Sequence, residues 1–293
     1  MELVIAAVIG LLAGTHCATW GMYKDAPHEG FTVRRYSRSV LVGLATGIAL
    51  HFLLRLDLTS PAAMVLFFGL CYVTERGIVE VYKTFVREED QSKYFIPMQF
   101  HVGGRVVQSR AGRLLAGLAY VVIVVLALAG IHKLQDVPIP IPRLVMVLLI
   151  GSIGGWISAF GGAWKDAPIE GFEIAKFFRS PLMTMAYAFI FSFLTDSYLL
   201  IALAALGYER ATIETYKTFF FPNKPRGKFA GKPVLFPEML TRRHRFVPLY
   251  VGIWLFVIAT GILAFTRPTP PVAGRGILAL SAGPVLATMS LDA

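Results

Sequence analysis

Lys24-Asp25-Ala26-Pro27-His28-Glu29-Gly30-Phe31 is an octapeptide that the chain carries twice, the second time as Lys165-Asp166-Ala167-Pro168-Ile169-Glu170-Gly171-Phe172. The two copies agree at seven of eight positions and lie 141 residues apart, about half of the 293-residue chain. At the same offset, Arg38 corresponds to Arg179 and Arg35 corresponds to Lys176. Self-similarity at a fixed offset indicates an internal duplication.

A second charged segment repeats in the same order, at an offset of 134 residues. Its first copy comprises Glu75-Arg76, Glu80 and Tyr82-Lys83-Thr84-Phe85, and its second copy comprises Glu209-Arg210, Glu214 and Tyr216-Lys217-Thr218-Phe219. Two matches in the same order predict a tandem duplication, with one unit at residues 1–134 and the other at residues 135–266.

The composition decides the class of protein. Soluble domains have roughly 45–50% apolar and about 25% charged residues, whereas this chain is 56% hydrophobic and only 16% charged. These values exclude an ordinary soluble globule, a disordered chain and a disulfide scaffold. Apolar stretches long enough to cross a membrane lie at residues 3–20, 39–55, 61–82, 113–131, 142–162, 180–195, 197–216 and 246–265. We therefore predict an all-α polytopic membrane protein with about eight transmembrane helices in two four-helix repeats, followed by an external C-terminal tail at residues 267–293.

Basic residues are distributed unevenly, since 23 of the 28 Lys and Arg lie at residues 21–38, 76–113, 163–180 and 210–245. Under the positive-inside rule, these loops are predicted to be cytoplasmic and both termini to lie outside the inner (plasma) membrane. Because each repeat has an even number of spans, the repeats are predicted to be parallel, with an approximate two-fold axis along the membrane normal. The net charge of +10 indicates affinity for anionic inner-leaflet lipid more than for nucleic acid.

Small residues point to close helix packing. Gly10-x-x-x-Gly14 recurs as Gly151-x-x-x-Gly155, and each pair puts two glycines on one helix face, where a second helix can approach closely. One interpretation brings the first helix of each repeat to the two-fold axis. The other has each glycine pair packing within its own four-helix unit.

The repeated charges form the candidate site. Its residues are Lys24, Asp25, Glu29, Arg35, Arg38, Glu75, Arg76, Glu80, Lys83, Lys165, Asp166, Glu170, Lys176, Arg179, Glu209, Arg210, Glu214 and Lys217. Arg76, Glu80 and Lys83 share one helix face in a plus–minus–plus stripe. In one interpretation, the charges of residues 24–31 pair with those of residues 75–83 and clamp the first interhelical link to the third helix. In the other, they bind phosphate head groups, anions or a partner subunit.

The long basic loops carry turn signals. Residues 99–108 alternate around Gly103-Gly104, which predicts a β-hairpin. Residues 227–237 are a candidate counterpart, although their prolines restrict them to an edge strand. The two segments together predict a small cytoplasmic cap of two hairpins.

No cofactor or metal is expected, because P-loop, dinucleotide-binding, zinc-protease and serine-hydrolase signatures do not occur in the sequence. His16, Cys17 and Cys71 fall in predicted spans and are interpreted as buried packing residues.

Three function classes follow. The preferred one is a non-catalytic scaffold or accessory subunit whose partners are anionic inner-leaflet lipid and another membrane or cytoplasmic subunit. The second is a transporter or channel for a small solute or lipid along the repeat interface. It is disfavoured because charged residues do not fall at the middle of a predicted span. The third is an enzyme acting on phosphorylated lipid, in which Asp25, Glu29, Glu75 and Glu80 would hold a divalent ion.

Overall fold

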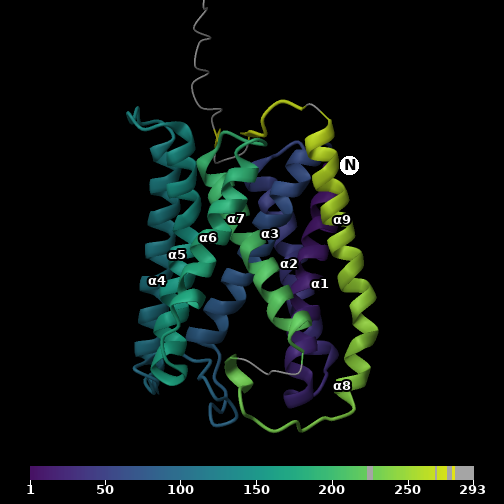
Figure 1. Ribbon diagram of the computed structural model, residues 1–293, viewed down its shortest axis with the longest axis vertical. Helices are drawn as coiled ribbons and strands as arrows, with labels where there is room; N and C mark the ends of the chain where they lie inside the picture. Colours follow the sequence, from purple (N-terminus) through teal and green to yellow (C-terminus); the bar gives the residue numbers. More distant parts are fainter. Residues whose placement is uncertain (223–226, 268, 276–278, 281–293) are drawn as a thin grey trace, which may run out of the picture.

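Eight long helices dominate the computed structural model, which describes residues 1–222, 227–267, 269–275 and 279–280 (Figure 1). They are α1 (Glu2–Glu29), α2 (Val33–Leu54), α3 (Pro61–Val81), α4 (Arg110–Leu134), α5 (Arg143–Glu170), α6 (Ile174–Phe191), α7 (Tyr198–Thr215) and α9 (Val247–Thr266). The short helix α8 (Met239–Arg242) and the 3-10 turn η4 (Arg243–Phe246) lead into α9. The protein is therefore an all-α protein. Six of its helices are long and apolar enough to cross a membrane, and α6 and α7, with 18 residues each, are the two predicted spans outside that set.

Successive long helices run in alternating directions (Figure 1). The loops at residues 87–109 and 227–238 lie together at the end of the bundle away from the N-terminus. We call this end the loop end. The octapeptides and the charged ends of α3 and α7 lie toward it.

The octapeptides are helical, which corrects the prediction that residues 24–31 form a link between helices. α1 continues through Pro27 to Glu29, and α5 continues through Pro168 to Glu170. Proline lacks an N–H group, so the carbonyl of Tyr23 loses its usual partner within the helix. Arg243 replaces that partner, since its Nη1 donates to the Tyr23 carbonyl oxygen over 3.0 Å.

Both helices end in the same way. The residues that follow them, Gly30 and Gly171, have φ angles of 73° and 85°, a region that favours glycine. α3 and α7 also end alike, because each continues into a π-helical turn with the sequence Tyr-Lys-Thr-Phe. These turns are η1 (Tyr82–Val86) and η2 (Tyr216–Phe220).

The glycine pairs pack within each half of the chain. A Cβ atom on Gly10 or Gly14 would lie 2.4 Å from a backbone oxygen of α2, and one on Gly155 would lie 2.7 Å from a backbone oxygen of α6. Gly151 likewise faces Ala188 of α6. The prediction that these glycines bring α1 and α5 to a central axis is therefore wrong, and the alternative interpretation holds.

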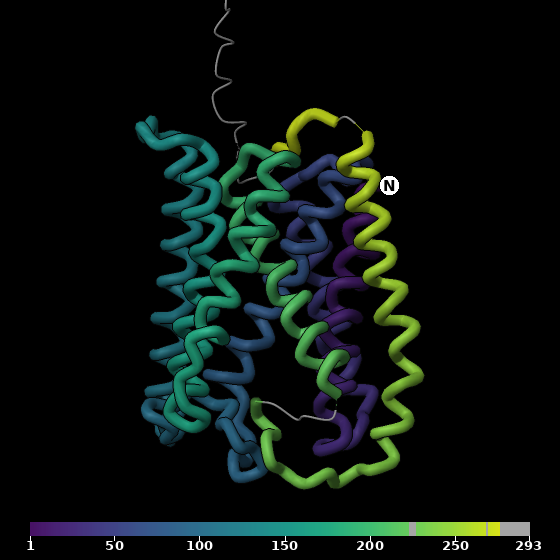
Figure 2. The backbone as a smooth tube through the Cα atoms, in the orientation of Figure 1, coloured from purple at the N-terminus to yellow at the C-terminus, as the bar shows by residue number. Residues whose placement is uncertain are grey.

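α3 and α7 form the central crossing instead (Figure 2). A Cβ atom on Gly207 would lie only 2.0 Å from the carbonyl oxygen of Gly69. Next to this contact, the Tyr208 hydroxyl donates to the carbonyl oxygen of Val65 over 3.0 Å. Buried apolar side chains of α1, α3, α5 and α7 surround the crossing and make up most of the largest core cluster.

Strands are short in the described chain. The predicted hairpin is present as β1 (His101–Val102) and β2 (Arg105–Val106), which pair antiparallel around Gly103 and Gly104. Its predicted counterpart is wrong, because residues 227–237 begin with the 3-10 turn η3 (Gly227–Phe229) and form no strand.

The predicted C-terminal tail is described only in part, since residues 268, 276–278 and 281–293 lie outside the described residues. In the described part, β3 (Gly274–Arg275) pairs with β4 (Ala279–Leu280). The Val272 backbone bonds to Leu194 and to the Thr195 hydroxyl, 2.8 and 2.6 Å away.

Candidate functional site

A buried Glu–Arg pair occupies the same place on α3 and on α7. The carboxylates of Glu75 and Glu209 are both 0% exposed. Each pairs with the next residue along its helix, Arg76 at 3.2 Å and Arg210 at 2.9 Å. The oxygens of both carboxylates accept no hydrogen bond within the described chain. Such a pair is costly to bury, so its environment must supply further compensation.

The predicted stripe of charges is present on the same helices. Glu80 pairs with Arg76 at 3.3 Å and with Lys83 at 3.6 Å. On α7 the equivalent contact joins Glu214 and Lys217 at 3.8 Å. The spacing read from the sequence therefore identified true neighbours on each helix.

Charges from the two halves of the chain meet around these stripes. The positive charge of Lys165, on α5, acts on Glu80 of α3. Likewise, the positive charge of Lys24, on α1, acts on Glu214 of α7, together with that of Arg76. We call this set the central charged cluster, which consists of Lys24, Glu75, Arg76, Glu80, Lys83, Lys165, Glu209, Arg210, Glu214 and Lys217.

The acidic residues of the first octapeptide have a different partner from the one predicted. Lys228, in η3, pairs with Asp25 at 2.9 Å and with Glu29 at 3.0 Å. Glu29 also pairs with Arg35 at 2.9 Å. Burial would lower the pKa of Lys228, but the two carboxylates outweigh burial and raise that pKa above 10.5. The expected ion pairs from residues 24–31 to residues 75–83 do not form within 4 Å in the described chain.

The second octapeptide pairs locally. Lys176 lies 3.1 Å from both Asp166 and Glu170. Arg38 and Arg179 join no ion pair within the described ranges, although Arg38 lies in the fields of Glu75 and Arg87.

Each loop at the loop end docks on the first helix of the other half. The N–H groups of Leu235 and Phe236 donate to the Pro27 carbonyl oxygen over 3.0 and 2.9 Å. The last carbonyls of a helix have no partner inside it, so α1 offers this acceptor at its end. His28 bonds through Nδ1 to the Pro233 carbonyl at 2.8 Å.

The reciprocal contact joins the loop at residues 87–109 to α5. The Trp164 indole N–H donates to the His101 carbonyl oxygen over 3.1 Å, and Lys165 lies 3.7 Å from the sulfur of Met98. The two loops also bond to each other, since the N–H of Phe95 donates to the Lys228 carbonyl oxygen over 2.7 Å.

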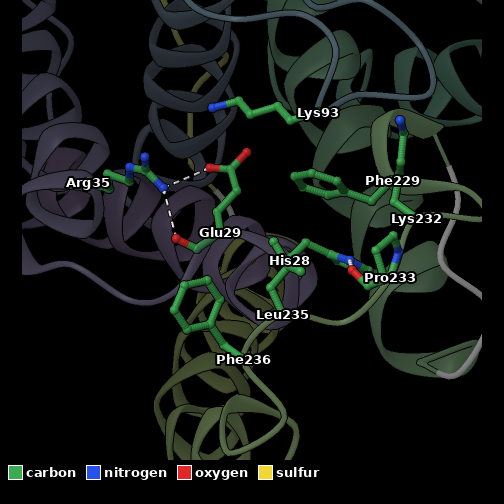
Figure 3. Close-up of a pocket in the computed structure, with 9 residues that line it drawn as sticks. All are labelled: His28, Glu29, Arg35, Lys93, Phe229, Lys232, Pro233, Leu235 and Phe236. Atoms are coloured by element: carbon green, nitrogen blue, oxygen red, sulfur yellow. Dashed lines mark hydrogen bonds and ion pairs between the residues drawn. The ribbon is translucent and has the colours of Figure 1, made fainter.

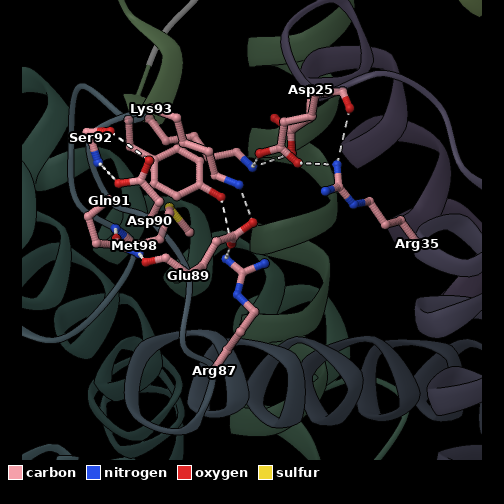
Figure 4. Close-up of polar contacts among 12 residues, drawn as sticks. Asp25, Arg35, Arg87, Glu89, Asp90, Gln91, Ser92, Lys93 and Met98 are labelled. Atoms are coloured by element: carbon pink, nitrogen blue, oxygen red, sulfur yellow. Dashed lines mark hydrogen bonds and ion pairs between the residues drawn. The ribbon is translucent and has the colours of Figure 1, made fainter.

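Polar contacts hold the loop at residues 87–109 in shape (Figure 4). Glu89 pairs with Arg87 at 2.7 Å and with Lys93, and it accepts a 2.9 Å bond from the Tyr94 hydroxyl. Burial would raise the pKa of Glu89, but the bonds from Lys93 and Tyr94 lower it overall. Gln91 Oε1 accepts from the N–H of Met98 over 2.8 Å. These contacts therefore fix the conformation of the loop.

A cavity of about 400 Å³ lies where the loop at residues 227–238 meets α1 and α2 (Figure 3). Its basic residues are Arg35, Lys93 and Lys232, and its one acidic residue is Glu29. Its other lining residues are His28, Phe229, Pro233, Leu235 and Phe236. Sequence reasoning identified only Glu29 and Arg35 here, because the loop lysines belong to no repeated motif.

The polar contacts of His16 were not predicted from the sequence. His16 is fully buried, its Nδ1 lies 3.2 Å from the Tyr72 hydroxyl, and its ring stacks on Tyr250 at 4.1 Å. The Trp20 indole N–H donates to the same hydroxyl over 3.0 Å. His16 was correctly interpreted as buried, but the sequence gives no signal for these partners.

The acidic groups do not converge as a metal site would require. Among the described residues, His, Cys, Asp and Glu form no group of three or more that could hold a metal ion. Glu209 also lies well inside a helix. Because η2 extends α7 to Phe220, Glu209 has 11 helical residues before it and 11 after it.

Comparison with protein-family models, with curated proteins and with solved structures finds no match.

Proposed function

We propose that the chain is a non-catalytic membrane scaffold or accessory subunit. In this proposal the central charged cluster holds the two halves of the chain together. The two loops at the loop end, each docked on the first helix of the other half, do the same. The loop end then presents a basic surface to anionic lipid and to a partner subunit.

The reciprocal docking of the loops is the observation that carries this proposal. One loop covers the end of α1 through Pro27 and His28, and the other covers the end of α5 through Trp164. Asp25 and Glu29 both contact Lys228. Charges that are satisfied by one another suit a clamp better than a reaction centre.

The proposal includes the duplication, with units at residues 1–134 and 135–266 in parallel orientation. It is supported by the matched ends of α1 and α5, where glycines have φ angles of 73° and 85°, and by the π turns that follow α3 and α7. We further propose that the loop end is cytoplasmic and that both termini lie outside an inner membrane. The 23 basic residues in the four segments at residues 21–38, 76–113, 163–180 and 210–245 support this orientation.

The enzyme alternative loses its argument from geometry. It required four acidic groups to converge, but Asp25 and Glu29 share Lys228, whereas Glu80 pairs with Arg76 and Lys83. Each acidic group therefore has a nearby cation in place of a shared metal.

Transport remains the second candidate, because Glu209 lies at the middle of the α7–η2 helix and is 0% exposed. Ionisable groups inside membrane-spanning helices commonly mark ion or proton pathways. The partner half supplies Glu75 in an equivalent position, which is the arrangement expected of a pathway between parallel repeats.

Native purification of the full chain, followed by reconstitution in vesicles, tests both candidates. A scaffold should co-purify with one protein at a fixed ratio, and Glu209→Gln should leave solute flux in the vesicles at the level of empty vesicles. Glu238→Gln is the matched control, since Glu238 is exposed in the loop. A solitary protein with a flux that Glu209→Gln abolishes and Glu238→Gln preserves would replace the scaffold by a transporter.

A further inference from the structure

The cavity at the loop end has the size and lining of a small-ligand site. Its volume of about 400 Å³ falls within the range of natural ligand pockets, about 300–1,000 Å³. Figure 3 shows Arg35 and Lys93 extending toward Glu29 from different elements, with Lys232 on the side of Phe229. Three cations from separate parts of the chain thus border one space.

The charge of the cavity is positive, even though Glu29 lines it. The Glu29 carboxylate already has two cations, Arg35 at 2.9 Å and Lys228 at 3.0 Å. It is 12% exposed and therefore contributes little free negative charge. Asp25 also pairs with Lys228, so Asp25 and Glu29 together balance Arg35 and Lys228. Lys93 is balanced by Glu89, which leaves Lys232 to set the sign.

Hydrogen-bond donors remain open in this space. Arg35 uses only Nη1 for its bonds to the carbonyl and carboxylate of Glu29, so Nε and Nη2 donate to no described atom. Lys232 donates to the Ser92 carbonyl oxygen over 2.9 Å, and an ammonium group has two further N–H donors. A planar guanidinium beside an ammonium is a combination that binds phosphate oxygens.

One wall of the cavity is apolar and faces outward. Leu235 is 65% exposed and Phe236 is 37% exposed, and both are held in place by the bonds from their N–H groups to Pro27. Gly30 admits the Phe236 ring, because a Cβ atom at Gly30 would lie 3.2 Å from it. Basic and aromatic residues together are typical of the head-group layer of a membrane.

We propose that this cavity binds a phosphate-bearing anion, with the head group of an anionic membrane phospholipid as the source that its apolar wall favours. Arg35 and Lys232 contact the phosphate oxygens, and Leu235 and Phe236 contact the glycerol and the first acyl carbons. The inference deepens the proposed function, since it names the ligand of the basic loop end and rests on that end facing the membrane surface.

Binding would also have a structural effect. The cavity is bordered by α1 and α2 of the first half and by the loop of the second half, so a phosphate held there joins the two halves across Glu29. A ligand that binds only the folded form stabilises it by mass action.

The test uses the full chain purified in mixed micelles of phosphatidylcholine and phosphatidylglycerol, with native mass spectrometry to measure the lipid retained. Wild type should retain phosphatidylglycerol in preference to phosphatidylcholine. The variant Arg35→Gln with Lys232→Gln keeps an N–H donor at both positions and removes the charges of the two residues that contact the phosphate. Its affinity for phosphatidylglycerol should fall about tenfold or more.

A matched control removes two charges from the same end outside the cavity. Arg34 and Arg105 are exposed there and do not line the cavity. The variant Arg34→Gln with Arg105→Gln should retain phosphatidylglycerol within about twofold of wild type, as expected for exposed charges. Equal losses in the two variants would show diffuse surface attraction and would overturn the inference.

A second arm titrates inorganic phosphate against the same proteins in phosphatidylcholine nanodiscs and follows the melting temperature. Phosphate should stabilise the wild type but not the variant Arg35→Gln with Lys232→Gln, and this result supports the phosphate site. If phosphatidylglycerol is not retained in the first arm, the same result identifies a soluble source. No selective response in either arm overturns the site. A solute flux that depends on Glu209, with selective lipid retention intact, would overturn the scaffold and leave this inference standing.

Discussion

Replacement of Gly207 by alanine should force α3 and α7 apart at their crossing. The added Cβ would lie 2.0 Å from the Gly69 carbonyl oxygen and 2.9 Å from the Gly69 Cα. The obstacle is backbone on a packed helix, so a rotamer change cannot relieve the overlap.

The magnitude follows from these distances. A carbon atom approaches a carbonyl oxygen to about 3.3 Å, so the helices must separate by roughly 1 Å. A gap of about 0.5–1 Å forfeits a quarter to a half of the dispersion energy of each contact across it. The 3.0 Å bond from Tyr208 to the Val65 carbonyl lies at the same crossing and would be stretched. Together these effects should cost about 3 kcal/mol.

Thermal unfolding in detergent measures this cost. A loss of this size should lower the melting temperature by roughly 6–12 °C. Gly21→Ala is the matched control, because a Cβ atom at Gly21, on α1, meets no other atom within 4 Å. It should be neutral or stabilise the protein by about 0.5–1 kcal/mol. Melting temperatures for the two variants within about 2 °C of each other would refute the reasoning.

Three further predictions use the same protein. Glu75→Lys should lower the free energy of unfolding by about 3–5 kcal/mol, because Arg76 then faces a like charge in a buried site. Exchange of the pair, as Glu75→Arg with Arg76→Glu, should recover at least half of this loss in the melting assay. Lys228→Met should lower the melting temperature at pH 8 and should matter less as the pH rises. The raised pKa of Lys228 means that its stabilisation is complete below the unfolded value of 10.5 and is lost as the pH passes through the higher folded value. A constant deficit up to about pH 12 would contradict this cause. Trp164→Phe removes the hydrogen bond to the His101 carbonyl oxygen. It should speed hydrogen exchange at residues 101–106 and leave the exchange rates at residues 227–236 unchanged. Equal rates at residues 101–106 in variant and wild type would show that this bond does not hold the hairpin.

Local features were predictable from the sequence because their causes are local. The stripe of Arg76, Glu80 and Lys83 follows from helical spacing, and the hairpin at residues 101–106 follows from Gly103-Gly104. Composition alone indicated a membrane protein, since it lacks the charge to coat a soluble surface. These inferences need no knowledge of which elements lie side by side.

Partners far apart in the chain were not predictable in the same way. Gly10 and Gly14 indicate that one face of α1 is approached closely, but the pattern does not say whether α2 or α5 approaches it. Residues 24–31 were interpreted as a link between helices, because the donor that replaces the missing N–H of Pro27 lies on Arg243, 220 residues from Tyr23. Lys228 was overlooked for the same reason, since its acidic partners belong to the other half of the chain.

The reciprocal docking of the loops also has a consequence for the order of synthesis. His28 and Pro233 are 205 residues apart. At a synthesis rate of about 5–20 residues per second, Pro233 is added roughly 10–40 s after His28, and the contact at the end of α1 can form only then. The hairpin at His101 can make its contact sooner, because Trp164 is added only 63 residues after His101. Asp25 and Glu29 therefore remain without Lys228 until most of the chain has been made. A nascent chain that stops before residue 228 would carry Asp25 without its cation, while Glu29 would keep only Arg35.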